Sequence, residues 1–125
     1  MEIEEYVPIE IEEEEIVEEE IFLIVEDQAS FPGGEAKLYE FIRNNVKYPQ
    51  LAKETGIEGT VFVQFVVEKD GTLSNVQALR KIGGGCDEEA IRVVKSMPKW
   101  KPGSQRGRNV RCSFTIPIKF TLQRT

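Results

Sequence analysis

The sequence predicts an α+β fold, a two-layer sandwich in which helices cover one face of a small antiparallel three-stranded sheet. Two stretches, 35–46 and 87–97, carry apolar residues at the spacing of a helix with one buried face. Two others, 60–69 and 110–122, are rich in apolar residues that recur at every second position, as in strands. Asp70-Gly71 directly follows the first of these strands and is a strong hairpin turn.

Charge divides the chain into two regions. The protein has 125 residues, which is one domain's length, and a net charge of −6. Residues 1–30 hold 13 of the 22 acidic residues and none of the 16 basic ones, so the remainder carries +7. We therefore expect residues 1–29 to be an acidic linker or arm, largely disordered, in which the apolar run 21–25 could pair as a strand. Residues 30–125 are expected to form the domain.

Two helices are predicted in the first half of the domain. A turn at Phe31-Pro32-Gly33-Gly34 precedes the first helix, which runs from Glu35 to about Asn45. Its buried stripe is expected to hold Leu38, Tyr39, Phe41, Ile42 and Val46. Pro49 suits the first position of a short second helix that ends near Glu54, and Gly56 supplies its C-terminal stop.

The middle of the chain is predicted to be a hairpin followed by a third helix. Strand 60–69 has apolar residues on both faces, which favours a central place in the sheet. The returning strand covers 72–82 and ends at three consecutive glycines. Asp87 is expected to cap the next helix, and Pro98 to end it.

The last strand has the most regular alternation in the chain. Apolar residues occupy every second position from Val110 to Leu122, which indicates one buried face. Pro117 lies within this strand and cannot donate a ladder hydrogen bond, so the strand is predicted at a sheet edge. A long edge strand offers unpaired N–H and C=O groups to another extended chain, and we therefore expect it to bind a partner.

Residue types that support catalysis or metal binding are scarce. The chain has no histidine, which excludes Ser-His-Asp and Cys-His arrangements, and its two cysteines are not spaced as a metal site. Cys86 precedes three acidic residues that oppose thiolate formation, and Cys112 falls on the apolar face of its strand. Whether the two form a disulfide stays open. We expect no enzyme activity, no catalytic residue, no cofactor and no metal.

Two other functions are compatible with the residues. The last 35 or so residues carry nine basic side chains and no acid near aromatic residues, so a nucleic-acid-binding domain is one alternative. The aromatic residues fall on the buried pattern, however, and no nucleic acid is expected as a partner. A self-associating domain is the other alternative, since an exposed edge can pair with its own copy as a homodimer.

A series of short motifs resembles one known family. The segment from about Phe31 to Gln123 resembles the C-terminal domain of TonB energy transducers of Gram-negative bacteria, in a variant similar to that of Bacteroidetes-type bacteria. The matching motifs are Phe31-Pro32-Gly33-Gly34, Tyr48-Pro49, Ala52, Gly56, Gly59, Asp70-Gly71, Val76, Glu88-Glu89-Ala90, Met97 to Gly103, and Phe114 to Ile118. They occur in the family's order over about three-quarters of the chain. The resemblance implies a TolA/TonB C-terminal-like fold.

The resemblance also implies a function and a location. Transducers of this family are anchored in the inner membrane, where they join ExbB and ExbD, and they reach across the periplasm. Their C-terminal domain binds the TonB box, a short extended segment of an outer-membrane transporter. Proton-motive force then drives uptake of iron-siderophore complexes, vitamin B12 or glycans. The anchor is not in this sequence and the linker is acidic, so a related module of another membrane protein is a further alternative.

Candidate partner-binding residues follow from the resemblance. In the family the TonB box adds as a strand beside the last strand, which here implies contact with Arg111, Cys112, Ser113, Phe114, Thr115 and Ile116. The segment before the family's Tyr-Pro pair also lies near the box, which adds Asn45, Lys47 and Tyr48. Asn45 and Lys47 stand where better-known members have glutamines. For Tyr48 and Trp100 packing is the favoured role.

Overall fold

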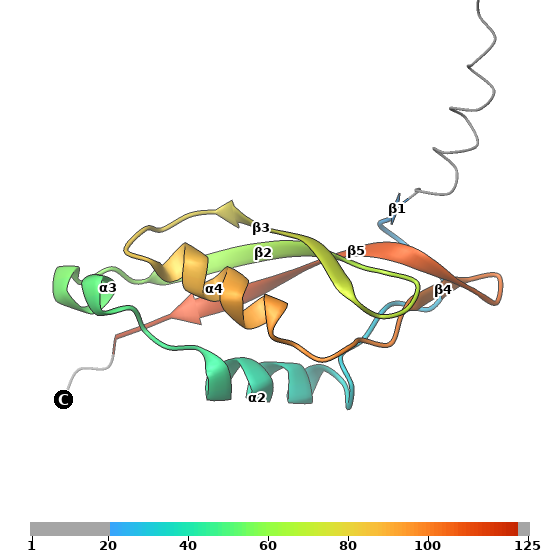
Figure 1. The fold of residues 1–125 in the computed structure, drawn as a ribbon, viewed down its shortest axis with the longest axis horizontal. Helices are drawn as coiled ribbons and strands as arrows, with labels where there is room; N and C mark the ends of the chain where they lie inside the picture. The colour runs from blue at the N-terminus through green and yellow to red at the C-terminus, as the bar shows by residue number, and fades with distance from the viewer. Residues whose placement is uncertain (1–20, 123–125) are drawn as a thin grey trace, which may run out of the picture.

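The computed structural model describes residues 21–122, so most of the predicted acidic arm lies outside the described residues. The fold within this range is mixed α and β (Figure 1). In chain order its elements are β1 (Ile21–Phe22), α2 (Glu35–Asn45), α3 (Gln50–Thr55), β2 (Gly59–Val67), β3 (Leu73–Arg80), α4 (Cys86–Lys95), β4 (Gly103–Gln105) and β5 (Arg108–Phe120).

The sheet is built on three long antiparallel strands, as the sequence predicts. Their order is β5-β2-β3, and β2 pairs with β5 in unbroken register from Gly59 opposite Phe120 to Val67 opposite Cys112. Two short strands extend the predicted sheet on the β5 side. β4 folds back antiparallel onto the start of β5, and β1 lies parallel to its next two residues. The predicted α+β class and the central place of β2 are confirmed.

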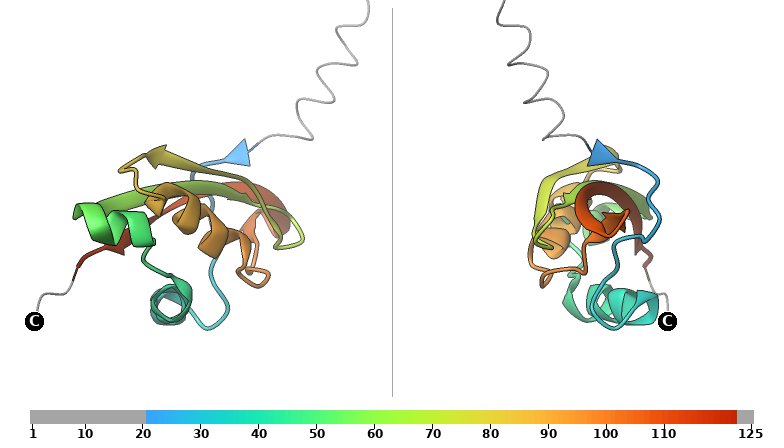
Figure 2. Two further views of the ribbon diagram at one scale, coloured as in Figure 1. Left: turned by 60° about the vertical axis from the view of Figure 1, so that its left-hand side comes forward. Right: turned by 90° about the vertical axis from the view of Figure 1, so that its right-hand side faces the viewer.

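The core lies between the sheet and the helices. Val61, Val63, Phe65 and Val67 alternate along β2 and are fully buried, because they point toward the helical layer. From β5, Cys112, Ile116, Ile118 and Phe120 join the same core. Helices α2, α3 and α4 lie on one side of the sheet in Figure 2, and α2 lies farthest from it.

Two helix starts differ from the sequence prediction. Asp87 was expected to cap α4, but that prediction was wrong, because the helix begins at Cys86 and Gly85 is its N-cap with a φ of 88°. Asp87 instead points back to the preceding loop, where its carboxylate accepts hydrogen bonds from the backbone N–H groups of Ile82 at 2.9 Å and Gly83 at 3.0 Å. Pro49 is the N-cap of α3 rather than its first residue.

The segment before α2 belongs to the folded unit. Backbone bridges join Asp27 to Ser104 and Ser30 to Lys101. The side chains of Val25 and Ala29 are buried in the core. The folded unit therefore begins before Ser30, the boundary expected from composition. Among residues 21–122, no helix has the length and apolar character needed to cross a membrane.

Candidate functional site

Strand β5 has one side that is only partly paired. β2 pairs with its inner side along most of its length. On the outer side, β4 pairs with residues 108–110 and β1 pairs with Arg111 and Cys112. No strand among residues 21–122 pairs with the outer side of residues 113–120, which we call the free edge. The free edge therefore keeps backbone hydrogen-bonding groups available to an added strand.

Pro117 shows which backbone groups face outward. Backbone N–H groups alternate between the two sides of a strand, and the β2–β5 register runs past Pro117 without a bulge. A proline is tolerated where its nitrogen points away from the ladder. Ser113 and Thr115 lie two and four positions before Pro117, so their N–H groups point to the same side as its nitrogen. The parallel pairing of Phe22 with Cys112 directs the N–H of Ser113 to β1, so we assign the N–H of Thr115 to the free edge.

A groove separates the free edge from helix α2. It consists of successive cavities of about 390, 580 and 890 Å³ that share lining residues from one to the next. α2 contributes Glu35, Leu38, Tyr39, Ile42 and Arg43 to its wall. On the opposite side, β5 contributes Phe114, Thr115, Ile116, Pro117 and Lys119. We call this space the edge groove.

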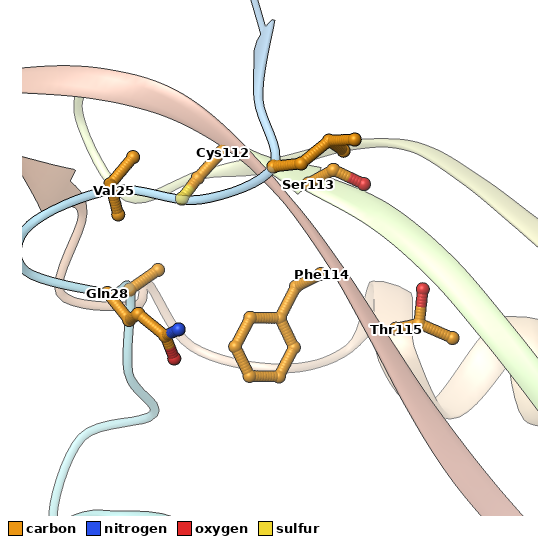
Figure 3. Close-up of a pocket in the computed structure, with 8 residues that line it drawn as sticks. Val25, Gln28, Cys112, Ser113, Phe114 and Thr115 are labelled. Carbon is orange, nitrogen blue, oxygen red and sulfur yellow. The ribbon is translucent and has the colours of Figure 1, made fainter.

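A smaller cavity of about 210 Å³ continues the edge groove toward β1. Val25 and Gln28 line it from the N-terminal segment, and Cys112 and Phe114 line it from β5 (Figure 3). The exposed side chains of Leu23 and Ile24 follow β1 directly in the chain. The groove therefore ends where the protein's own N-terminal segment reaches the edge.

Aromatic residues form the floor of the groove at this end. Trp100 is only 3% exposed, and its ring centroid lies 5.1 Å from that of Phe114 and 5.3 Å from that of Phe65. Phe31, just before α2, meets Trp100 edge-on at 5.9 Å. The expected packing role of Trp100 agrees with this burial. Its indole N–H has no acceptor among the described residues.

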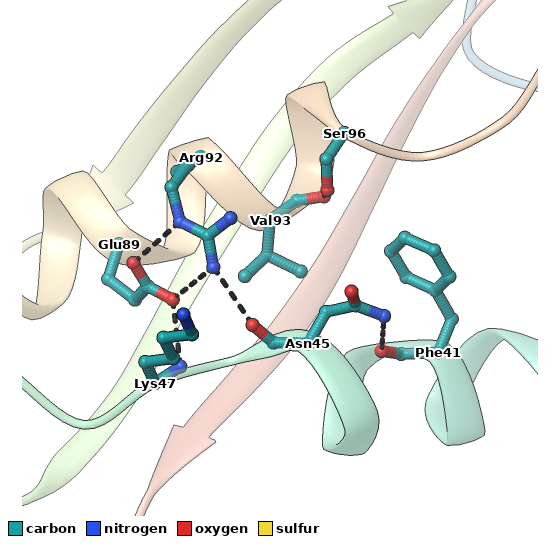
Figure 4. A network of polar contacts seen from close by, with 7 residues as sticks. All are labelled: Phe41, Asn45, Lys47, Glu89, Arg92, Val93 and Ser96. Carbon is teal, nitrogen blue, oxygen red and sulfur yellow. Dashed lines mark hydrogen bonds and ion pairs between the residues drawn. The ribbon is translucent and has the colours of Figure 1, made fainter.

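Polar contacts hold the far end of α2 against α4 (Figure 4). Arg92 donates to the backbone oxygen of Asn45 at 2.9 Å and forms an ion pair with Glu89 at 2.6 Å. Glu89 in turn accepts from the backbone N–H of Lys47 at 2.8 Å. The hydrogen bond from Arg92 lowers the pKa of Glu89, so this carboxylate stays charged at neutral pH. Together with the packing of Phe31 on Trp100, these contacts hold α2, the wall of the groove, at both ends.

The predicted residues before the Tyr-Pro pair have mainly structural contacts. Asn45 donates to the backbone oxygen of Phe41 at 2.8 Å, and neither Asn45 nor Lys47 lines the edge groove. Tyr48 does line it, while its hydroxyl donates to the backbone oxygen of Ile57 and its ring packs edge-on against Phe120. Contact of these residues with a partner stays a prediction.

Charges differ between the two ends of the groove. Glu35 lines the aromatic end, whereas Arg43, Lys53 and Lys119 line the other end. Arg111 lies outside the groove and donates to Glu68 at 2.8 Å, and this hydrogen bond lowers the pKa of Glu68.

Sequence reasoning assigned α2 to the core alone. No sequence signal indicated that Tyr39 and Arg43 would line a groove opposite β5.

The described residues offer little for metal or thiol chemistry. Between Ile21 and Leu122, no three Cys, Asp or Glu side chains are grouped so that they could hold a metal ion. Cys86 and Cys112 are both free and buried, and burial raises the pKa of the Cys86 thiol.

Comparisons with known proteins agree with the fold. The chain is similar to a solved TonB C-terminal domain from Helicobacter pylori, with a TM-score of 0.56 at 24% identity, covering 72% of this chain and 81% of that one. A second structure of that domain gives a TM-score of 0.52, covering 72% of this chain and 95% of that one. The fold is that of TonB C-terminal domains.

Sequence comparison identifies the family. The family model described as Gram-negative bacterial TonB protein C-terminal matches residues 44–122, and the chain belongs to this family. Protein TonB of Vibrio cholerae is 32% identical over 78 residues, which is 62% of this chain and 32% of that protein. Protein TonB of Pseudomonas aeruginosa is 26% identical over 77 residues, or 62% of this chain and 22% of that protein. The chain thus spans less than a third of the length of either relative.

Proposed function

We propose that this domain is the partner-binding end of a TonB energy transducer, which binds the TonB box of outer-membrane transporters by β-strand addition. The observation that carries the proposal is the free edge of β5, residues 113–120, beside a preformed groove. Strand addition uses backbone hydrogen bonds for affinity and side-chain pockets for selectivity, and the site offers both. Family membership supports the same role.

Within the predicted docking strand, the residues differ in availability. Thr115 belongs to the free edge, whereas the N–H of Ser113 faces β1. Arg111 and Cys112 already pair with β1, so they join the docking strand only after β1 detaches. We propose the transducer's periplasmic location, its anchoring in the inner membrane and its coupling to ExbB and ExbD by analogy with the family.

The alternative functions have less support. A nucleic-acid surface needs exposed aromatic rings among its basic residues, but Trp100 and Phe120 are buried. Self-association through the free edge uses the same backbone groups as strand addition, and it is an outcome of the test below.

An NMR titration with TonB-box peptides from transporters of the same organism tests the proposal. We expect amide shifts concentrated at residues 113–116. Several peptides that cause no shift there would overturn strand addition at β5. The same titration on the chain without residues 1–24 should extend the shifts to Arg111 and Cys112. Sedimentation of the free domain over a concentration series shows whether a second copy occupies the edge.

A further inference from the structure

The β4–β5 hairpin carries a group of basic side chains outside the edge groove, at the end of the molecule opposite α3 (Figure 1). Together with the turn of the β2–β3 hairpin it forms what we call the hairpin surface, residues 69–71 and 99–108. The two parts lie together, because Asn109 donates to the backbone oxygen of Lys69 at 3.2 Å and Trp100 donates to that of Gly71 at 2.9 Å. The exposed basic residues of this surface are Lys69, Lys99, Lys101, Arg106 and Arg108.

These basic side chains have few counter-charges. None of the five forms an ion pair or a side-chain hydrogen bond with another residue of the described range 21–122. Asp70 is the acidic residue within the surface, and its pKa is lowered first by hydrogen bonds from Thr72 and then by the charge of Lys99. The hairpin surface therefore keeps an excess of positive charge.

The N-terminal segment already brings acidic groups to the hairpin surface. The carboxylate of Glu26 accepts from the backbone N–H of Arg106 at 2.9 Å, and that of Asp27 accepts from the hydroxyl of Ser104 at 3.1 Å. The backbone of Asp27 also bridges to Ser104. The guanidinium groups of Arg106 and Arg108 stay exposed beside these contacts.

The rest of the acidic arm joins the fold next to the same surface. Residues 1–20 lie outside the described residues, and they hold eleven glutamates and no basic residue. β1 runs parallel to β5 with Ile21 opposite Arg111, so lower residue numbers lead toward residues 108–110. The outer side of 108–110 already pairs with β4, so the arm cannot continue the ladder there. Any contact of the arm with the hairpin has to be made by its side chains.

Distance favours the hairpin surface over the basic residues of the edge groove. Arg108 lies three residues from Arg111 along β5, or about 10 Å, whereas Lys119 lies eight residues away in the opposite direction, or about 26 Å. Three extended residues span at most about 11 Å. The three glutamates directly before Ile21 can therefore reach Arg108, but they fall well short of Lys119.

We infer that Glu18, Glu19 and Glu20 bind Arg106 and Arg108 of the same chain, and that this contact holds β1 against β5. β1 is only two residues long, and the two residues after it are exposed, so its own pairing contributes little stability. Several carboxylates facing two guanidinium groups form a network, which is more stable than an isolated exposed ion pair.

The contact would decide where the accessible edge of β5 begins. While β1 is attached, it covers Arg111, Cys112 and the N–H of Ser113. Release of β1 frees these backbone groups. The contact between the arm and the hairpin does not itself depend on strand addition at β5.

Hydrogen exchange of the Ser113 amide in the intact chain tests the inference, because this N–H faces β1. The first variant removes the three charges next to β1, and its control removes three charges at the far end of the arm. The substitutions are Glu18→Gln, Glu19→Gln and Glu20→Gln in the variant, and Glu2→Gln, Glu4→Gln and Glu5→Gln in the control. The amides of the β2–β3 ladder show whether each chain stays folded.

A second pair of variants reverses charge at the two basic surfaces. The hairpin variant combines Arg106→Glu with Arg108→Glu, and the groove variant combines Arg43→Glu with Lys119→Glu. A charge-swapped chain adds Glu18→Lys, Glu19→Lys and Glu20→Lys to the hairpin variant. If the hairpin variant does not fold, the glutamine variant decides alone, since it changes no residue of the described range.

We expect the glutamine variant next to β1 to speed exchange at Ser113 about fivefold, the far control to leave it unchanged, and salt to have the same effect as the variant. The hairpin variant should also speed exchange, and the charge-swapped chain should restore protection. Equal exchange in all chains, or an effect confined to the groove variant, would overturn the inference. Protection that depends on protein concentration would assign the contact to the arm of a second copy and overturn it within one chain.

Discussion

Gly71 is the point where the β2–β3 hairpin touches the groove floor. Its φ is +89°, and a Cβ placed on it would lie 2.2 Å from the backbone oxygen of Trp100. The backbone N–H of Trp100 also donates to the oxygen of Gly71 at 2.9 Å. We predict that Gly71→Ala separates the hairpin from the Trp100 segment, because a Cβ and a carbonyl oxygen cannot approach so closely.

The expected loss of unfolding free energy can be compared with a matched glycine. Gly107 has a φ of +75°, and an added Cβ there meets no atom within 4 Å. Ala at Gly107 should cost about 1 kcal/mol, for the left-handed backbone alone. Ala at Gly71 adds the clash and the weakened hydrogen bond from Trp100, for a total of about 3 kcal/mol. The difference between the two variants, about 2 kcal/mol, is the cost of the contact between the added Cβ at Gly71 and the backbone of Trp100.

Urea denaturation, followed by Trp100 fluorescence and by far-ultraviolet circular dichroism, measures both variants. We expect a lower midpoint for Gly71→Ala than for Gly107→Ala at an unchanged slope. Equal losses for the two variants would refute the reasoning, since they would show that the hairpin does not abut Trp100 in solution.

Three other predictions follow from the same contacts. Thr115→Pro should weaken binding of a TonB-box peptide at least tenfold with little change in unfolding free energy, because the lost N–H faces outward like the nitrogen of Pro117; a calorimetric titration of a folded variant with unchanged affinity would contradict it. The pKa of Glu68 is lower in the folded protein than in the unfolded chain, because a guanidinium donates to it, so unfolding free energy should fall as pH falls below about 5. Denaturation over that pH range should show a shallower decline for Glu68→Gln, and parallel curves would argue against this source of acid sensitivity. Cys86 and Cys112 are buried free thiols and should react with a thiol reagent only in denaturant; fast labelling of the native protein would contradict their burial.

Local patterns were enough to predict most of the secondary structure. The alternation in 110–122 indicated β5, and the burial of Cys112, Ile116, Ile118 and Phe120 confirms its buried face. The Asp70-Gly71 pair correctly indicated the hairpin. These predictions depend on one-dimensional periodicity, which mainly reflects whether a side chain faces the core.

Helix starts were harder to predict than helix positions. Asp87 has a residue type that favours N-caps, but Gly85 adopts a left-handed conformation and is the N-cap of α4, two residues earlier than expected. The carboxylate then reaches the N–H groups of the preceding loop, where it is 6% exposed. Whether the carboxylate accepts from N–H groups of the helix or of the preceding loop depends on the path of that loop, and no local sequence pattern shows this path.

Residue spacing predicted the α+β class and the candidate edge strand, because it reflects which faces are buried, and ordered short motifs indicated the family. Only the tertiary structure showed that α2 lies opposite the free edge, that β1 pairs with Arg111 and Cys112, and that Tyr39 and Arg43 line one groove with Lys119. The physical reason is that these residues are brought together by long-range packing. Arg43 and Lys119 are far apart in the chain, and a helix's periodicity specifies its apolar face but not the element beside its polar face.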